Sequence, residues 1–85
     1  MRLENKVCIV TGGGQGIGEA IAMRLAVEGA RVVIAEINAE NAQRVAGEIN
    51  AMAGEALALP TDISDTESVT EMAKTTIEKY GRIDV

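Results

Sequence analysis

The feature that most constrains the fold is a glycine-rich stretch that directly follows a short apolar run. The run is Val7–Val10, and the stretch is Thr11-Gly12-Gly13-Gly14-Gln15-Gly16-Ile17-Gly18. A backbone that approaches an anion closely needs glycine, because a Cβ atom penalises positive φ and obstructs the approach. The N–H groups at the start of a following helix then face the anion. The order of strand, glycine turn and helix therefore predicts a phosphate-binding geometry.

The spacing of the glycines excludes two of the three common glycine loops. A P-loop needs a lysine directly after its last glycine, but the frame that ends at Gly18 continues with Glu19. The fingerprint Gly-x-Gly-x-x-Gly also has no frame here, because Ile17 or Glu19 stands where the third glycine belongs. The pattern that fits is Thr-Gly-x-x-x-Gly-x-Gly. Taken alone, this pattern also allows a glycine turn that binds nothing.

Composition limits both the class of protein and its partners. The 85 residues are 47% hydrophobic and 25% charged, with one Tyr and no Phe or Trp, so the core must be aliphatic, as in β-α-β layers. A net charge of −5 provides no basic surface, so neither nucleic acid nor a membrane is expected as a partner. Cys8 is the single cysteine and histidine is absent, so no disulfide or metal site is predicted. The polar N-terminus does not resemble a signal segment, and a cytoplasmic location is expected.

Apolar runs and helical periodicities alternate along the chain. Strands are expected at three places, with a fourth beginning at the end: Val7–Val10, Arg31–Ala35, Ala56–Leu59 and Ile83–Val85. Helices are expected between them: Ile17–Glu28, a segment from the cap Asn38 to Gly54, and a segment from the capping box Ser64-x-x-Glu67 to Gly81. This order predicts a doubly wound parallel sheet with strand order 3-2-1-4, in a three-layer α/β/α arrangement.

Apolar positions at helical spacing predict the buried face of each helix. The expected buried positions are Ile17, Ala20, Ile21 and Leu25 in the first helix; Ala42, Val45, Ala46, Ile49 and Ala53 in the second; and Val69, Met72, Ala73, Thr76, Ile77 and Tyr80 in the third. Charged residues occupy the remaining faces, so each helix is expected to cover the sheet with one side only.

Two acidic residues follow predicted strands at the carboxyl edge of the sheet, where ligands of open α/β sheets bind. Glu36 directly follows the second strand, and Asp62 follows the third. Glu36 also follows the glycine loop at close to the spacing of about 20 residues at which a dinucleotide site places a carboxylate on a ribose. The alternative for both residues is a solvated charge, and Asp62 could also cap a helix.

Four features agree in type, order and spacing with the short-chain dehydrogenase/reductase family, and the resemblance extends over the whole chain. They are the loop from Thr11 to Gly18, the acidic Glu36, the pair Asp62-Ile63, and the segment Gly81–Val85. The resemblance implies a Rossmann-like fold and an NAD(H)-dependent oxidoreductase that interconverts secondary alcohols and ketones by hydride transfer. It also implies that residues 1–85 are the adenine-side half of the dinucleotide-binding domain, without the catalytic half.

The resemblance assigns the glycine loop to the pyrophosphate of the cofactor. Gly12, Gly16 and Gly18 would let the turn and the helix approach it, and the N–H of Ile17 would be a donor. No residue of the loop is basic.

The resemblance assigns the acidic edge to adenosine. Glu36 would accept hydrogen bonds from the ribose hydroxyls, Asp62 would accept from the adenine amino group, and the backbone of Ile63 would contact the ring. Gln15 and Ile37 are neutral at positions where NADP-using members often carry Arg or Lys. NAD(H) is therefore expected to be preferred over NADP(H), because Glu36 would repel a 2′-phosphate.

The family's catalytic Asn, Ser and Tyr-x-x-x-Lys are not found in this sequence. The only tyrosine, Tyr80, is followed four positions later by Asp84 in place of lysine. The 85-residue chain is therefore expected to be non-catalytic, with an alcohol or ketone substrate only in a complete protein. Two other functions remain open. They are a module that binds an adenine nucleotide without redox chemistry, and a structural piece that forms a homo-oligomer through an open sheet edge.

Overall fold

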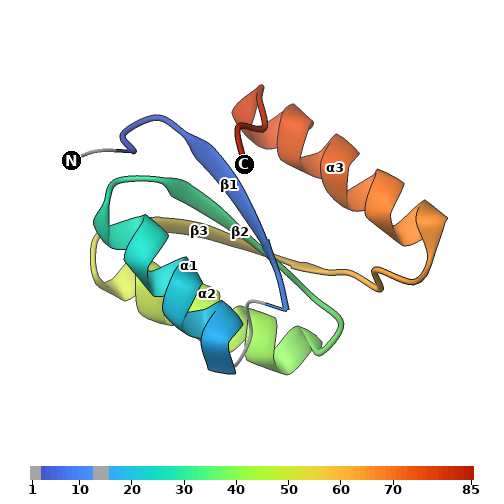
Figure 1. Ribbon diagram of the computed structural model, residues 1–85, viewed down its shortest axis with the longest axis horizontal. Coiled ribbons are helices and arrows are strands. Elements are labelled where there is room, and N and C mark those ends of the chain that lie inside the picture. The colour runs from blue at the N-terminus through green and yellow to red at the C-terminus, as the bar shows by residue number, and fades with distance from the viewer. Residues whose placement is uncertain (1–2, 13–15) are drawn as a thin grey trace.

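The computed structural model describes residues 3–12 and 16–85, in which three strands and three helices alternate along the chain (Figure 1). The elements are β1 (Val7–Thr11), α1 (Gly16–Val27), β2 (Arg31–Glu36), α2 (Ala39–Ala51), β3 (Glu55–Pro60) and α3 (Thr66–Tyr80). The prediction of three strands alternating with three helices is therefore confirmed.

β2 lies at the centre of a parallel sheet, between β1 and β3. The register pairs Val7 with Arg31 and Arg31 with Glu55, so the three strands start side by side. Every residue of β2 after Arg31 is buried, as expected for a central parallel strand that is covered on both faces. Because the strands are parallel and in this register, their carboxyl ends meet at one edge of the sheet.

The C-terminal residues add a short backbone pairing to the outer side of β1. The N–H of Asp84 donates to the carbonyl of Val7, and the N–H of Ile9 donates to the carbonyl of Val85, both at 2.8 Å. The Asp84 carboxylate also accepts from the Arg82 guanidinium (2.7 Å) and from the N–H of Val7 (2.8 Å), and these bonds hold its pKa below the usual value. The segment occupies the position predicted for strand four without being a regular strand. Self-association through this edge stays a prediction.

α1 and α2 cover one face of the sheet, and α3 covers the other (Figure 1). The core between the sheet and the first two helices is aliphatic, and its buried residues are Cys8, Val10, Ala22, Ala26, Ala30, Val32, Ile34, Ala42, Val45, Ala46 and Ile49. On the other face, α3 buries Met72 and Thr76, and the Thr76 hydroxyl donates to the Met72 carbonyl at 2.8 Å. These are the three layers that the sequence predicts.

The predicted buried face of α1 is wrong. Three of its four positions are exposed, namely Ile17 (82%), Ala20 and Ile21 (47%), whereas Leu25 packs partly against the core. The helix instead buries Ala22 and Ala26. Two alanines let the helix backbone lie close to the sheet, where branched side chains would hold it away in a densely packed interior. Size, and not hydrophobicity alone, therefore selects the face of α1.

The helix ends follow the prediction in part. Asn38 caps α2, and Gly81 ends α3 in the left-handed conformation (φ 81°), both as predicted. The capping box predicted at Ser64 is wrong, because α3 begins after Asp65, whose side chain accepts from the N–H of Glu67 at 3.0 Å. The Ser64 hydroxyl is already bonded within the preceding loop.

The end of α2 explains why Ala53 is exposed and not buried as predicted. The helix ends at Ala51, Ala53 takes a left-handed φ of 65°, and the N–H of Gly54 donates to the Ile49 carbonyl at 3.0 Å. This is the bonding of a Schellman turn, whose left-handed position favours glycine. A Cβ on Gly54 would lie 2.8 Å from Cγ2 of the buried Ile49. Both neighbouring positions therefore favour glycine, position 53 because of its backbone conformation and position 54 because a Cβ would meet Ile49.

We expect Ala53→Gly to raise the free energy of unfolding and Gly54→Ala to lower it. Removing a Cβ from the left-handed position should contribute about 0.5 to 1 kcal/mol. Adding one against Ile49 should cost about 1 to 3 kcal/mol, because a packed core resists the extra volume. Urea unfolding followed by circular dichroism measures both. A loss of stability in Ala53→Gly, or none in Gly54→Ala, would contradict this account of the turn.

Candidate functional site

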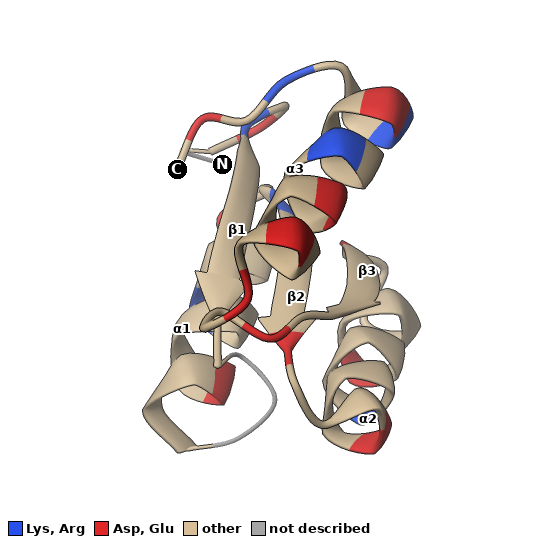
Figure 2. Ribbon diagram, turned by 90° about the vertical axis from the view of Figure 1, so that its right-hand side faces the viewer, with Lys and Arg blue, Asp and Glu red and all other residues tan. Residues whose placement is uncertain are grey.

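The carboxyl ends of β1, β2 and β3 surround a hollow of about 140 Å³. Figure 2 shows acidic segments of the ribbon where β2 ends and where β3 continues into α3. The residues that line the hollow are Gly12, Ala35, Glu36, Ile37, Thr61, Asp62 and Ile63. Five of them are residues that the sequence analysis assigned to a cofactor, so the fold brings together positions that lie far apart in the sequence.

The glycine loop reaches the hollow from β1. Gly12 has a φ of 67° and Gly16 a φ of 59°, and an added Cβ would meet nothing within 4 Å at either position. Glycine is therefore favoured at both by backbone conformation, not by a lack of space. Gly16, the exposed Ile17 and the half-exposed Gly18 form the first turn of α1, whose N–H groups have no partner within the helix. Gln15 lies outside the described residues.

Glu36 is the last residue of β2 and is only 7% exposed. One oxygen of its carboxylate, Oε2, accepts the backbone N–H of Asn38 at 3.1 Å. The main-chain carbonyl of Glu36 accepts the N–H of Thr61 at 3.0 Å. Ile37, the next residue, is exposed beside the hollow. A carboxylate is thus held in the wall of the hollow.

Asp62 follows β3, and Ser64 fixes its carboxylate. The Ser64 hydroxyl and N–H donate to Oδ1 at 2.6 Å and 2.9 Å, and these two bonds lower the pKa of Asp62. Among the described residues, no donor reaches the other oxygen, Oδ2. The N–H of Asp62 donates to the Ser68 hydroxyl at 2.9 Å, which ties the loop to α3. Asp62 is therefore an ionised acceptor at neutral pH, and Ile63 beside it is exposed.

Sequence reasoning gave Thr61 no role, although it lines the hollow and is buried. Its hydroxyl donates to the Leu59 carbonyl at 2.7 Å, and its N–H donates to the Glu36 carbonyl. The available signal was weak: a polar residue directly after a predicted strand. Thr61 joins the ends of β2 and β3, which fixes the distance between the two acidic residues.

Tyr80 lies away from the hollow, at the C-terminal end of α3, where the Arg31 guanidinium is 5.7 Å from its ring centroid. Burial, with a smaller effect of the Glu55 carboxylate, raises the pKa of Tyr80 to about 12. Its hydroxyl is buried and has no hydrogen-bond partner among the described residues. Tyr80 therefore keeps its proton at neutral pH and cannot serve the hollow.

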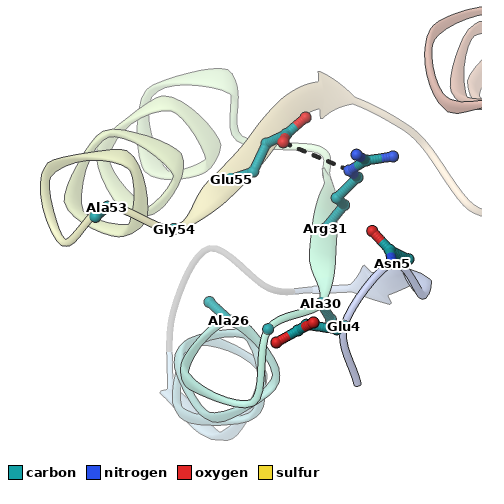
Figure 3. Close-up of a pocket in the computed structure, with 9 residues that line it drawn as sticks. Glu4, Asn5, Ala26, Ala30, Arg31, Ala53, Gly54 and Glu55 are labelled. Atoms are coloured by element: carbon teal, nitrogen blue, oxygen red, sulfur yellow. Dashed lines mark ion pairs between the residues drawn. The ribbon is translucent and has the colours of Figure 1, made fainter. Parts of the chain in front are cut away.

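A second hollow, of about 310 Å³, lies at the opposite edge of the sheet (Figure 3). It is open between the C-terminal ends of α1 and α2, and small residues such as Ala26, Ala30 and Gly54 form its floor. Two of the charged residues that line it form an ion pair, in which Arg31 Nε lies 3.5 Å from Glu55 Oε1. None of the predicted site residues that the structure describes lines it.

The hollow at the carboxyl edge is suited to binding groups that donate hydrogen bonds. Its lining offers two carboxylates, exposed apolar side chains and a left-handed glycine, and none of its lining residues is basic. Carboxylates accept hydrogen bonds from hydroxyl and amino groups. The first turn of α1 adds backbone donors of the kind that hold phosphates.

Comparison with known proteins identifies the family. A model of the short chain dehydrogenase family matches residues 6–85. The chain belongs to that family. It is 40% identical to the 7α-hydroxysteroid dehydrogenase of Escherichia coli K12. The match covers the full length of this chain and 33% of the length of that protein. The chain therefore spans about a third of the length of this short-chain dehydrogenase.

Two solved structures of short-chain dehydrogenases match nearly the whole chain. A 7α-hydroxysteroid dehydrogenase complexed with NADH and 7-oxo glycochenodeoxycholic acid has a TM-score of 0.95 and 41% identity, and the match covers 98% of this chain and 32% of that one. A 3-ketoacyl-(acyl-carrier-protein) reductase from Brucella melitensis complexed with NADH has a TM-score of 0.89 and 43% identity, with 96% and 32% covered. The fold is thus that of about a third of each of these short-chain dehydrogenases.

In the part of the chain that the structure describes, no helix is both long and apolar enough to cross a membrane. The cytoplasmic location expected from the sequence stays a prediction.

We expect Ser64→Ala to raise the pKa of Asp62 toward the ordinary carboxyl value. The substitution removes the 2.6 Å hydroxyl bond, which is the larger of the two effects that lower this pKa, and leaves the N–H bond in place. Carbon-detected NMR titration of the Asp62 carboxyl measures the change. Thr66→Ala, at an exposed position just beyond, is the matched control and should leave the pKa unaltered. An unchanged pKa in Ser64→Ala would show that the hydroxyl does not stabilise the carboxylate.

Proposed function

We propose that residues 1–85 form the adenine-side half of a dinucleotide-binding domain. The complete protein would be an NAD(H)-dependent oxidoreductase that interconverts secondary alcohols and ketones. The observation that carries the proposal is that the carboxylates of Glu36 and Asp62 share one hollow with the left-handed Gly12. Membership of the short-chain dehydrogenase family supports it, as do the two similar structures that contain NADH.

The residues present fit the adenosine and pyrophosphate groups of such a cofactor. The ribose hydroxyls would donate to Glu36, and the adenine amino group would donate to Asp62, whose Oδ2 accepts nothing among the described residues. The exposed side chains of Ile37 and Ile63 would flank the flat base. Gly16, Ile17 and Gly18 would present backbone donors to the pyrophosphate.

The bound dinucleotide would supply the hydride donor or acceptor, and the residues of this chain would bind and orient it. Among the described residues, the lining of the hollow holds the carboxylates of Glu36 and Asp62 but no tyrosine, lysine or histidine. Tyr80, with a pKa of about 12 and a position outside the hollow, does not take that role. We therefore propose that the 85-residue chain binds without catalysing.

Calorimetric titration of the pure chain with NADH, ADP-ribose and AMP tests the proposal. We expect ADP-ribose to bind within about threefold of NADH, because the proposed contacts lie on adenosine and pyrophosphate. AMP should bind more weakly, since it lacks the second phosphate. AMP binding at least as tightly as NADH would favour a non-redox nucleotide module, and no binding of any of the three would favour a structural role. Steady oxidation of a secondary alcohol by the chain would contradict the non-catalytic part.

We expect NADH to bind more tightly than NADPH, by about tenfold to a hundredfold. A 2′-phosphate near the Glu36 carboxylate would replace a hydrogen bond with a repulsion of about 1 to 3 kcal/mol after screening by solvent and salt. Glu36→Ser combined with Ile37→Arg should reverse the preference. Glu40→Ser removes the same charge from an exposed position in the first turn of α2 and serves as the control. The test compares the dissociation constants of NADH and NADPH at one salt concentration. Tighter binding of NADPH by the unchanged chain would refute the assignment of Glu36.

A further inference from the structure

The Glu36 carboxylate is hydrogen-bonded to a residue that lies outside the lining of the hollow. Its Oε2 accepts the backbone N–H of Asn38 at 3.1 Å, across a turn of two residues. Glu36 is buried, with 7% of its surface exposed. The bond lies within the chain and fixes the direction of one carboxylate oxygen.

The N–H of Asn38 is itself fixed by helix α2. Asn38 is the N-cap, with a φ of −84°, and its side chain accepts the N–H of Asn41 at 3.0 Å. Its carbonyl accepts the N–H of Ala42, also at 3.0 Å. α2 in turn is anchored in the core by fully buried residues such as Val45 and Ile49. The donor to Glu36 therefore moves only if the first turn of α2 moves.

We infer that Asn38 is a positioning residue for Glu36, and that its backbone N–H sets how well the hollow discriminates between a ribose 2′-hydroxyl and a 2′-phosphate. This inference rests on the proposed function. A carboxylate that is oriented beforehand loses less side-chain freedom on binding and presents a fixed charge. Without the N–H, Oε2 of Glu36 loses this bond, and the carboxylate can shift from a phosphate far enough to relieve part of the repulsion.

Two substitutions at Asn38 separate the N–H from the cap. Asn38→Ala keeps the N–H and removes the capping side chain. Asn38→Pro removes both, and the φ of −84° is close to the value of about −65° that proline requires. A backbone ester at Asn38, introduced by chemical synthesis, removes the N–H alone and keeps the side chain, so it replaces the proline variant if that variant does not fold.

The readout is the ratio of the NADPH and NADH dissociation constants, measured by calorimetry beside urea unfolding. We expect Asn38→Pro or the ester to reduce the ratio by about threefold to tenfold. This corresponds to part of the free energy of one hydrogen bond to a charged group. Asn38→Ala should leave the ratio within about twofold while it lowers the urea midpoint through the lost cap. The inference would be overturned if Asn38→Ala and Asn38→Pro changed the ratio equally, or if the ester left the ratio unchanged.

Glu36→Ser distinguishes a failure of this inference from a failure of the proposed function. If Glu36→Ser collapses the ratio and the ester does not, Glu36 binds the ribose without help from Asn38, and only the inference is overturned. If Glu36→Ser leaves the ratio unchanged, Glu36 does not face the ribose, and both are overturned.

Discussion

Two backbone hydrogen bonds just beyond the strand ends hold the carboxyl edge of the sheet together. The N–H of Gly12 donates to the Ala35 carbonyl, and the N–H of Thr61 donates to the Glu36 carbonyl, both at 3.0 Å. They extend the parallel pairing of β1, β2 and β3 into the loops that lead to α1 and α3. Each loop is thereby fixed to the end of the central strand. The hollow is therefore a product of sheet pairing.

The helices reinforce this arrangement because their first turns point to the same edge. In a parallel sheet each connecting helix runs antiparallel to the strands, so it begins where the preceding strand ends. The buried alanines of α1 bring that helix close to the sheet, and Arg44 Nη2 of α2 reaches Glu19 Oε1 of α1 at 3.0 Å. The N–H groups of two helix starts thus lie at the edge that also carries the acidic residues.

A structural feature could be predicted from the sequence where a local pattern determines it. The strands were predictable from their apolar runs, and Glu36 and Asp62 were predictable at the carboxyl edge because each follows such a run. The buried face of α1 was not, because the packing distance to the sheet favours Ala22 over Ile21 against the order of hydrophobicity. Asp65 and Ser64 were equally good caps by residue type. The contribution of Asn38 to the acidic edge is made by its backbone, which no residue type reveals.

The charge of the hollow follows from the kind of donor that holds its carboxylates. Glu36 accepts a backbone N–H, and Asp62 accepts the hydroxyl and N–H of Ser64, all of which are neutral. Neutral donors orient a carboxylate without cancelling its charge, whereas a lysine or arginine would do both. Arg44 is paired with acidic side chains on α1 and α2, and Arg31 lies at the opposite edge of the sheet. A ligand hydroxyl would be attracted by the charge of these carboxylates, while a further phosphate would be repelled by it. Discrimination between the two cofactors would then depend on the neutral groups around Glu36 as much as on Glu36 itself.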